Sequence, residues 1–180
     1  MNKFGNHNVS GMLLWNIDQY DNNAPGNLVA SLPRRKMGFA GRLSYDYDNR
    51  YMFEVNAGYN GSENFAKGHK WGFFPSVAVG WNVSQENFFE PLKDVISNLK
   101  LRASYGLVGN DQLLDSSGGL IRFIYMSDIT LQSENAGFTT GDKQQITLNG
   151  PVYTRYQNND LTWEVGEKLN VGLICSCSTP

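Results

Sequence analysis

Two histidines and two short charge clusters are the residues of this chain whose types could do chemistry. His7 and His69 are its only histidines. A metal or catalytic pair needs cysteine or carboxylate partners at suitable spacing, and the sequence places none beside them. Asp46, Asp48 and Arg50 resemble a charged site, but such residues typically solvate a turn. We therefore expect no catalytic residues, no metal and no cofactor.

Lys100 and Arg102 are spaced two residues apart and share one face of a strand. They could guide a substrate, although pairing with carboxylates or plain solvation explains them as well. Cys175 and Cys177 flank a single serine, a spacing that rarely gives a structural disulfide, and no other feature supports redox chemistry.

Bulk composition removes several classes of protein. The net charge of −2 leaves no basic patch, so we expect no nucleic-acid partner. No stretch of the sequence approaches the roughly 20 apolar residues of a transmembrane helix. The first residues are polar and do not form a secretory signal, so either the chain is not a membrane protein or it is a piece of something longer.

Long segments with alternating apolar and polar residues must position these side chains. The clearest runs from Arg50 to Asn60, with Tyr51, Phe53 and Val55 on one face. A transmembrane β-strand needs about 9–11 residues, whereas strands of soluble proteins have roughly 5–6. The alternation therefore predicts an all-β membrane protein.

We expect about six such segments, joined as an antiparallel up-and-down meander. The segments are 3–18, 35–47, 50–60, 71–84, 99–108 and 161–173. Pro75 predicts a bulge, and Pro91 predicts a short helix over Leu92–Ser97 in a periplasmic turn. Region 109–160 is predicted to be a long functional loop with short strands at Ile121–Met126 and Gln145–Leu148.

The alternation also predicts faces and one turn. Residues directly opposed in an antiparallel pair face the same way, so the odd-numbered apolar sets exclude a two-residue loop. They predict a loop of three or five residues, most simply 48–50 with Tyr47 opposite Tyr51. The lipid-facing side chains are expected to be Tyr51, Phe53, Val55, Val77, Val79, Trp81 and Leu101. Aromatic side chains should gather at both interfaces, with Trp163 at the outer one.

Five ordered sequence segments resemble the barrel of the SusC/RagA family of TonB-dependent outer-membrane transporters. These segments are Phe4–Gly11, Arg42–Tyr51, Phe74–Trp81, Leu99–Asn110 and Leu161–Leu173. The resemblance implies a 22-stranded transmembrane β-barrel, of which residues 1–173 would supply about six strands. Residues 174–180 depart from the pattern, as a truncation or frameshift would explain.

The resemblance also implies partners and a location. We expect the cell outer membrane, a SusD-like lipoprotein, the TonB complex acting through a plug region that this chain lacks, and an oligosaccharide or peptide substrate. By itself the chain would not transport. The candidates for ligand contact are outer-loop aromatic residues, namely Phe123, Tyr125, Phe138, Tyr153 and Tyr156.

Two other classes of protein remain open at this point. A soluble all-β carbohydrate-binding module would have shorter strands, with the apolar faces meeting in a core. A β-rich hydrolase is disfavoured because no acid, base or nucleophile set is present. Whether the apolar faces of the strands are exposed or buried in a core distinguishes these two classes of protein from a membrane barrel.

Overall fold

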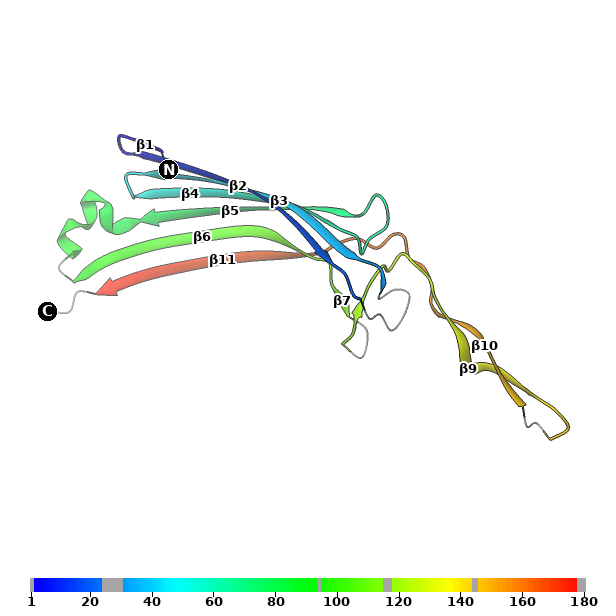
Figure 1. Cartoon of the computed structure of the whole chain (residues 1–180). Coiled ribbons are helices and arrows are strands. Elements are labelled where there is room, and N and C mark those ends of the chain that lie inside the picture. Colours follow the sequence, from blue (N-terminus) through cyan, green and yellow to red (C-terminus); the bar gives the residue numbers. More distant parts are fainter. Residues whose placement is uncertain (1, 24–30, 94, 115–117, 144–145, 178–180) are drawn as a thin grey trace.

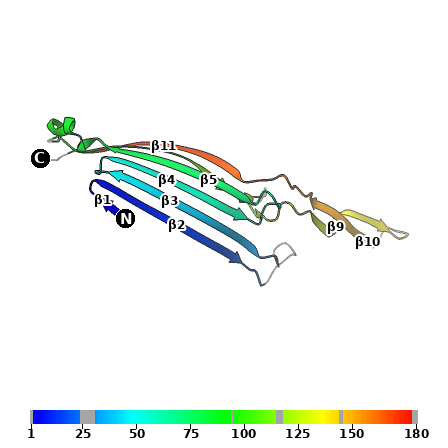
Figure 2. The same ribbon diagram turned by 90° about the horizontal axis from the view of Figure 1, so that it is seen from above.

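One curved antiparallel sheet is the main element of the computed structural model, which describes residues 2–23, 31–93, 95–114, 118–143 and 146–177. Its strands follow the order β1-β2-β3-β4-β5-β6-β11, so that each long strand pairs with its neighbour along the chain until β11 joins β6 (Figures 1 and 2). The strands are β1 Asn2–Phe4, β2 His7–Tyr20, β3 Arg34–Tyr47, β4 Tyr51–Ser62, β5 Trp71–Asn82, β6 Ile96–Asn110 and β11 Glu164–Cys177.

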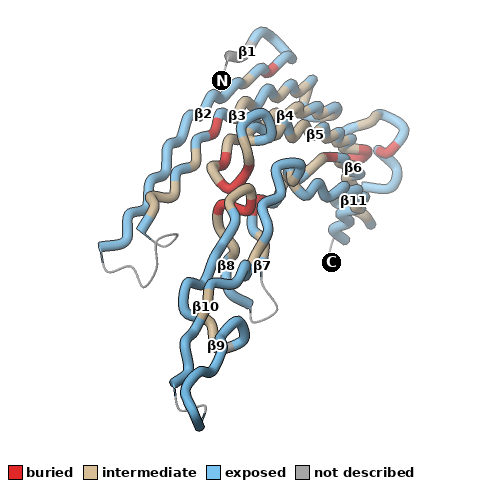
Figure 3. Tube along the Cα trace, turned by 90° about the vertical axis from the view of Figure 1, so that its right-hand side faces the viewer, coloured by how far each residue is buried: buried red, intermediate tan, exposed pale blue. Residues whose placement is uncertain are grey.

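The predicted meander of about six long strands is confirmed. The six long strands have 12 to 15 residues each, which is the membrane-spanning length rather than the soluble one. Seen along the strands, the sheet is an arc with β7 and β8 on its concave side (Figure 3). The strand count of a complete barrel stays a prediction.

The first predicted segment is wrong in one respect, because it contains a hairpin. Gly5 has a φ of +61°, a left-handed conformation that glycine adopts readily, and it separates β1 from β2. The last segment also differs, since β11 begins at Glu164 and pairs with β6 as far as Cys177. Residues 174–177 (Ile-Cys-Ser-Cys) therefore continue the ladder, although their pattern is not that of the preceding strand.

The turn between β3 and β4 is the predicted one. Tyr47 pairs with Tyr51, and Asp48 and Asn49 at its tip have φ values of 53° and 54°. The amide of Arg50 donates to the Tyr47 carbonyl at 2.9 Å. Aspartate and asparagine tolerate the left-handed region better than most residues do.

Replacing Asn49 by valine is expected to destabilise the fold by about 1–3 kcal/mol, because a β-branched side chain is strained at positive φ. Asn49→Gly is the matched control and should be close to neutral, since glycine adopts this conformation without strain. Urea unfolding of the lipid-reconstituted protein measures both. Equal losses would show that the asparagine side chain, and not the backbone conformation, is what matters.

Pro75 lies within β5 without a bulge, so that expectation is wrong. It pairs with Ala57 of β4 in an unbroken register. The pairing of β5 with β6 begins only at Ser76 and continues to Asn82. Proline has no N–H to donate, and it occupies the point where β5 has no partner on the β6 side.

The predicted helix is present in the turn but in another place. It consists of two 3-10 segments, η1 Val83–Gln85 and η2 Asn87–Leu92, and Pro91 lies inside the second instead of at its start. Ile96 already belongs to β6. The expectation of proline at a helix start was therefore misleading. The turn begins directly after Asn82, the last residue of β5, and η2 begins four residues before Pro91.

The long region after β6 contains more regular structure than expected. It forms β7 Leu113–Leu114, β8 Leu120–Ile121 and a long hairpin of β9 Asp128–Thr140 with β10 Ile146–Arg155. The hairpin extends away from the sheet (Figure 1). The short strand expected at Ile121–Met126 is reduced to its first residue. That at Gln145–Leu148 is part of β10, although Gln145 lies outside the described residues.

The sheet has no conventional core. The buried apolar side chains among the described residues are Phe65, Val83, Phe89, Phe123 and Ile124, and all of them lie in loops or 3-10 turns. Among the described residues, no helix is long and apolar enough to cross a membrane. The apolar side chains of the long strands must therefore be covered by something other than this chain.

Candidate functional site

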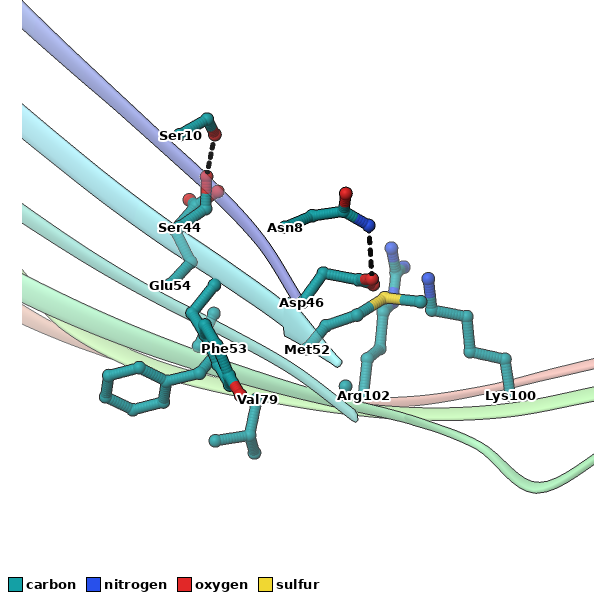
Figure 4. A pocket seen from close by; sticks show the side chains of 13 residues that line it. Asn8, Ser10, Ser44, Asp46, Met52, Phe53, Glu54, Val79, Lys100 and Arg102 are labelled. Atoms are coloured by element: carbon teal, nitrogen blue, oxygen red, sulfur yellow. Dashed lines mark hydrogen bonds between the residues drawn. The ribbon is translucent and has the colours of Figure 1, made fainter. Parts of the chain in front are cut away.

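The outward face of the sheet carries an apolar band. Cross-strand pairs join Phe53 to Val79, Val55 to Val77, and Trp81 to Leu101, so the register places all seven predicted residues on one face. Val55 is half-buried and the other six are 37–51% exposed. Phe53 and Val79 point away from the polar side chains of the opposite face (Figure 4). The face that the sequence analysis assigned to lipid is therefore exposed in the structure.

The inward face is polar and is held together by side-chain hydrogen bonds. Asn8 donates to Asp46 at 3.1 Å, and Ser10 and Ser44 are joined at 2.6 Å. Arg42 lies 3.6 Å from Glu54. All of these residues except Arg42 border a hollow of about 380 Å³, and Lys100 and Arg102 line its other side (Figure 4). The arrangement suits a water-filled or protein-filled lumen and would be costly against hydrocarbon.

Lys100 and Arg102 lie on the inward face, as their spacing predicted. Neither forms an ion pair with a carboxylate in the described part of the chain. Asp46 is on the same side of the sheet, and its carboxylate accepts the side-chain amide of Asn8 and the backbone amide of Asn49. The Asp46 carboxylate therefore stabilises the turn between β3 and β4. This agrees with the interpretation of Asp46, Asp48 and Arg50 as turn residues and not as a charged site.

A small aromatic core closes the concave side where the long loops begin. Trp163 packs against Phe65 and Phe74, with ring centroids 5.5 and 5.2 Å apart, and its indole N–H donates to the Lys70 carbonyl at 3.1 Å. A Cβ at Gly109 would overlap the Phe74 ring. The expectation that Trp163 joins an outward aromatic rim is thus wrong, because the chain places it before β11 starts and on the loop side.

The carboxylate of Asp111 is the polar centre of the same region. Its two oxygens lie 2.7 and 2.8 Å from the Lys36 ammonium, and Ser62 donates to it at 2.7 Å. Asn64 donates to the Asp111 backbone carbonyl at 3.0 Å. Burial raises the pKa of Asp111, but the hydrogen bonds from Lys36 and Ser62 lower it by more, so the net shift is downward. Four residues from three chain regions are joined in this way.

The five loop aromatics do not form one site. Phe123 is 5% exposed and forms an edge contact with Tyr125 at 6.2 Å, so its ring packs within the loop. Tyr153 and Tyr156 stack at 5.3 Å and are 54% and 74% exposed. Phe138 is exposed farther along the hairpin. The tyrosine pair is the part of this set that could present flat rings to a ligand.

The opposite rim is organised by Glu86, which the sequence did not single out. Its Oε1 accepts the Tyr51 hydroxyl at 2.7 Å and the Trp81 indole N–H at 3.1 Å, and Arg50 lies 3.7 Å from Oε2. The hydrogen bonds from Tyr51 and Trp81 hold the pKa of Glu86 below its ordinary value. No local pattern could have indicated this carboxylate, because its partners are on separate strands.

Each histidine has a hydrogen-bond partner in this arrangement. His7 shares a hydrogen bond of 2.8 Å with the Tyr45 hydroxyl, and His69 lies 3.0 Å from the Asn159 carbonyl. Within the described ranges, no group of three histidine, cysteine or carboxylate residues could hold a metal ion. Cys175 and Cys177 are both free thiols.

Comparisons with known proteins agree with the sided sheet. The chain is 35% identical over 133 residues to TonB-dependent receptor P3 of Formosa agariphila, which covers 74% of this chain and 12% of the relative. It is 34% identical over 137 residues to TonB-dependent receptor SusC of Bacteroides thetaiotaomicron, covering 76% of this chain and 13% of that protein. No protein-family model matches the chain.

Solved structures give the same fold. The RagAB peptide transporter superposes with a TM-score of 0.70 at 18% identity, over 98% of this chain and 20% of that one. The RagAB peptide importer in its closed-closed state also gives 0.70, at 17% identity and the same coverage. These likenesses show that the sheet has the same fold as part of the RagAB structures.

The class of protein defined by fold and face is therefore a β-barrel receptor, of which the described sheet forms one stretch of wall. The chain belongs to the SusC/RagA family of TonB-dependent receptors. It spans about an eighth of the length of the curated relatives that it matches. Those relatives are named as receptors and not as enzymes.

Proposed function

We propose that this chain forms part of the barrel wall of an outer-membrane importer of large nutrients. The observation that carries the proposal is the sided sheet of membrane-spanning strands, apolar and exposed outward and polar inward. Such a surface is stable only where lipid covers the apolar face. Residues 1–173, or through Cys177 where the ladder ends, would be the barrel segment.

The partners follow from the same proposal. A SusD-like lipoprotein would cover the outer loops, and the TonB complex would act on a plug domain inside the barrel. The substrate would be an oligosaccharide or a peptide, and the solved neighbours named as peptide importers support the second class. The exposed Tyr153–Tyr156 pair is our candidate contact, together with Tyr125 and Phe138, while Phe123 would support them from within the loop.

The six long strands would not transport by themselves. Bacterial barrels begin at about eight strands, and the described sheet ends at β1 on one side and β11 on the other. We expect import to require the whole transporter. Dissipating the proton-motive force should abolish uptake of the peptide or oligosaccharide, and uptake that continues would contradict a TonB-dependent mechanism.

A soluble carbohydrate-binding module is the alternative, and the exposed band counts against it. A sandwich would cover the apolar face with a second sheet. The described β9–β10 and β7–β8 pairs form separate two-stranded sheets, and neither pairs with the main sheet. The strand lengths of 12 to 15 residues also exceed those of ordinary sandwiches.

Expression of the chain alone gives a direct test. Because the band is exposed and the two edges carry free backbone groups, we expect an insoluble product that disperses as β-structure only in detergent. Size-exclusion chromatography and circular dichroism with and without detergent measure this. A stable soluble monomer in buffer would overturn the membrane assignment and favour the binding module.

A further inference from the structure

The turn between β5 and β6 exposes apolar side chains that the wall itself does not explain. Phe88 is 63%, Leu92 49% and Val95 65% exposed, whereas Phe89 is 3% exposed and serves as the turn's own core. The turn lies beyond the end of β5, at the end of the sheet remote from the β9–β10 hairpin (Figure 1). Apolar groups gathered on one short turn indicate an interaction surface.

Glu86 fixes the side of the wall on which this turn lies. Its carboxylate accepts hydrogen bonds from Tyr51 and Trp81, which are directly opposed on β4 and β5 and belong to the outward apolar band. The entry to η2 is therefore held against the outward face. Phe88 lies on the same turn, one residue past the start of η2, and is exposed next to the end of the band.

The level of the turn relative to the membrane follows from the same contacts. Tyrosine and tryptophan prefer membrane–water interfaces, with their rings in the apolar layer and their polar tips toward the headgroups. The Tyr51 hydroxyl and the Trp81 indole N–H both donate to Glu86, which places this carboxylate at headgroup depth. Lys93, exposed at the end of η2, can reach lipid phosphate with its ammonium while its stem lies along apolar surface.

We propose that residues 83–93, together with Val95, form an interfacial anchor that binds phospholipid of the periplasmic leaflet. Phe88, Leu92 and Val95 enter the boundary between headgroups and acyl chains, and Lys93 contacts the phosphates. Lipid is the occupant because the surface is continuous with the outward apolar band. Residues 83–95 carry Glu86, Glu90 and Asp94 against Lys93 alone, so the apolar contact and not net charge carries the binding. The inference rests on the proposed function, since only a membrane-inserted wall supplies that leaflet.

Depth-dependent quenching tests the anchor. The whole transporter, with Cys175 and Cys177 replaced by serine, is labelled with an environment-sensitive fluorophore at Phe88→Cys and reconstituted in phosphatidylcholine–phosphatidylglycerol vesicles. We expect lipids carrying a shallow nitroxide to quench the label more than lipids carrying a deep one. Val79→Cys is the reference on the outward band, and Ser44→Cys is the reference on the polar face.

The outcomes separate the two proposals. A quenched Val79 label with an unquenched Phe88 label overturns the anchor and leaves the barrel wall intact. An unquenched Val79 label overturns the membrane assignment itself, and the anchor with it. Quenching at both positions, deeper for Val79 and shallower for Phe88, with no quenching at Ser44, supports both.

A second variant tests the role of Glu86 in holding the turn. Glu86→Ala removes the acceptor for Tyr51 and Trp81, and we expect quenching of the Phe88 label to fall at least twofold while the Val79 label is unchanged. Glu90→Ala, an exposed carboxylate on the same turn, is the matched control and should leave both labels as they were. Unchanged Phe88 quenching in Glu86→Ala would show that the carboxylate does not position the turn.

Discussion

Replacing Val77 by arginine is expected to destabilise the reconstituted barrel by about 2–4 kcal/mol, the cost of a cation at the middle of the lipid-facing surface. Val77 lies near the centre of β5, opposite Val55 on one side and Tyr105 on the other, and is 43% exposed. Val55 and Val79 beside it are apolar, and the polar group opposite Val77 is the Tyr105 hydroxyl, which already interacts with Glu167. Urea unfolding in phospholipid vesicles measures the loss.

The matched control is the same residue placed on the opposite face. Ser44→Arg puts the cation directly across from Glu54 and two residues from Asp46. An exposed pair of this kind changes stability by only about 0–1 kcal/mol, so this variant should unfold close to the unmodified protein. Similar losses for both variants would mean that the two faces meet similar environments, and the lipid assignment would fail.

Removing the carboxylate of Asp111 is expected to loosen the outer loops. Asp111→Ala leaves the Lys36 ammonium without its partner, and the two side chains are 8% and 28% exposed. Breaking a fully buried pair costs about 3–5 kcal/mol. Because Lys36 retains some contact with water, we expect about 2–3 kcal/mol. Unfolding gives this value, and hydrogen exchange should rise in residues 62–66 and 111–114.

A surface pair from the same strand provides the control. Asp18 lies 3.9 Å from Arg34, and its side chain is 58% exposed. Asp18→Ala should therefore cost less than about 1 kcal/mol and leave the exchange of the outer loops unchanged. If Asp111→Ala behaves like Asp18→Ala, the loops are held by the aromatic core around Trp163 and not by the carboxylate.

The pKa of Asp111 predicts when this stabilisation is lost. Because its native pKa is lowered below its ordinary value, the folded state favours the ionised form. The contribution is complete above the unfolded pKa of about 3.9 and disappears as the pH falls through the lower native value. We expect Asp111→Asn to be less stable than the unmodified protein at pH 7, with the difference shrinking below about pH 4. A constant difference down to pH 2 would contradict the linkage.

The period-two alternation predicted the sheet because each strand records its own faces locally. Residues 35–47 and 50–60 needed no partner to show which side chains share a face. Parity excluded a two-residue loop between them, and Tyr47 opposite Tyr51 was the simplest of the pairings that it allowed. The ordered segments then identified the family. Errors arose where local signals were weak, as at Gly5, or where proline admitted several roles, as at Pro75 and Pro91.

The β9–β10 hairpin shows why a long alternating pattern is needed to predict a strand from the sequence. Its strands contain few apolar residues, and the register shifts at several points, between Leu148 and Gly150 among others. A strand without a consistent apolar face leaves no periodic signal in the sequence. Its pairing is decided by backbone hydrogen bonds, which every residue type except proline can donate and accept.

The sequence by itself determined the strands, their two faces, one turn and the family to which they belong. Only the tertiary structure decided which distant groups meet: Lys36 with Asp111, 75 residues apart, Trp163 with Lys70, 93 residues apart, and Glu86 with Tyr51 across two strands. The physical reason is that the alternation of apolar and polar residues shows, within each strand, which face is apolar. A hydrogen bond between distant residues depends on how the loops bring them together, and no sequence pattern shows that.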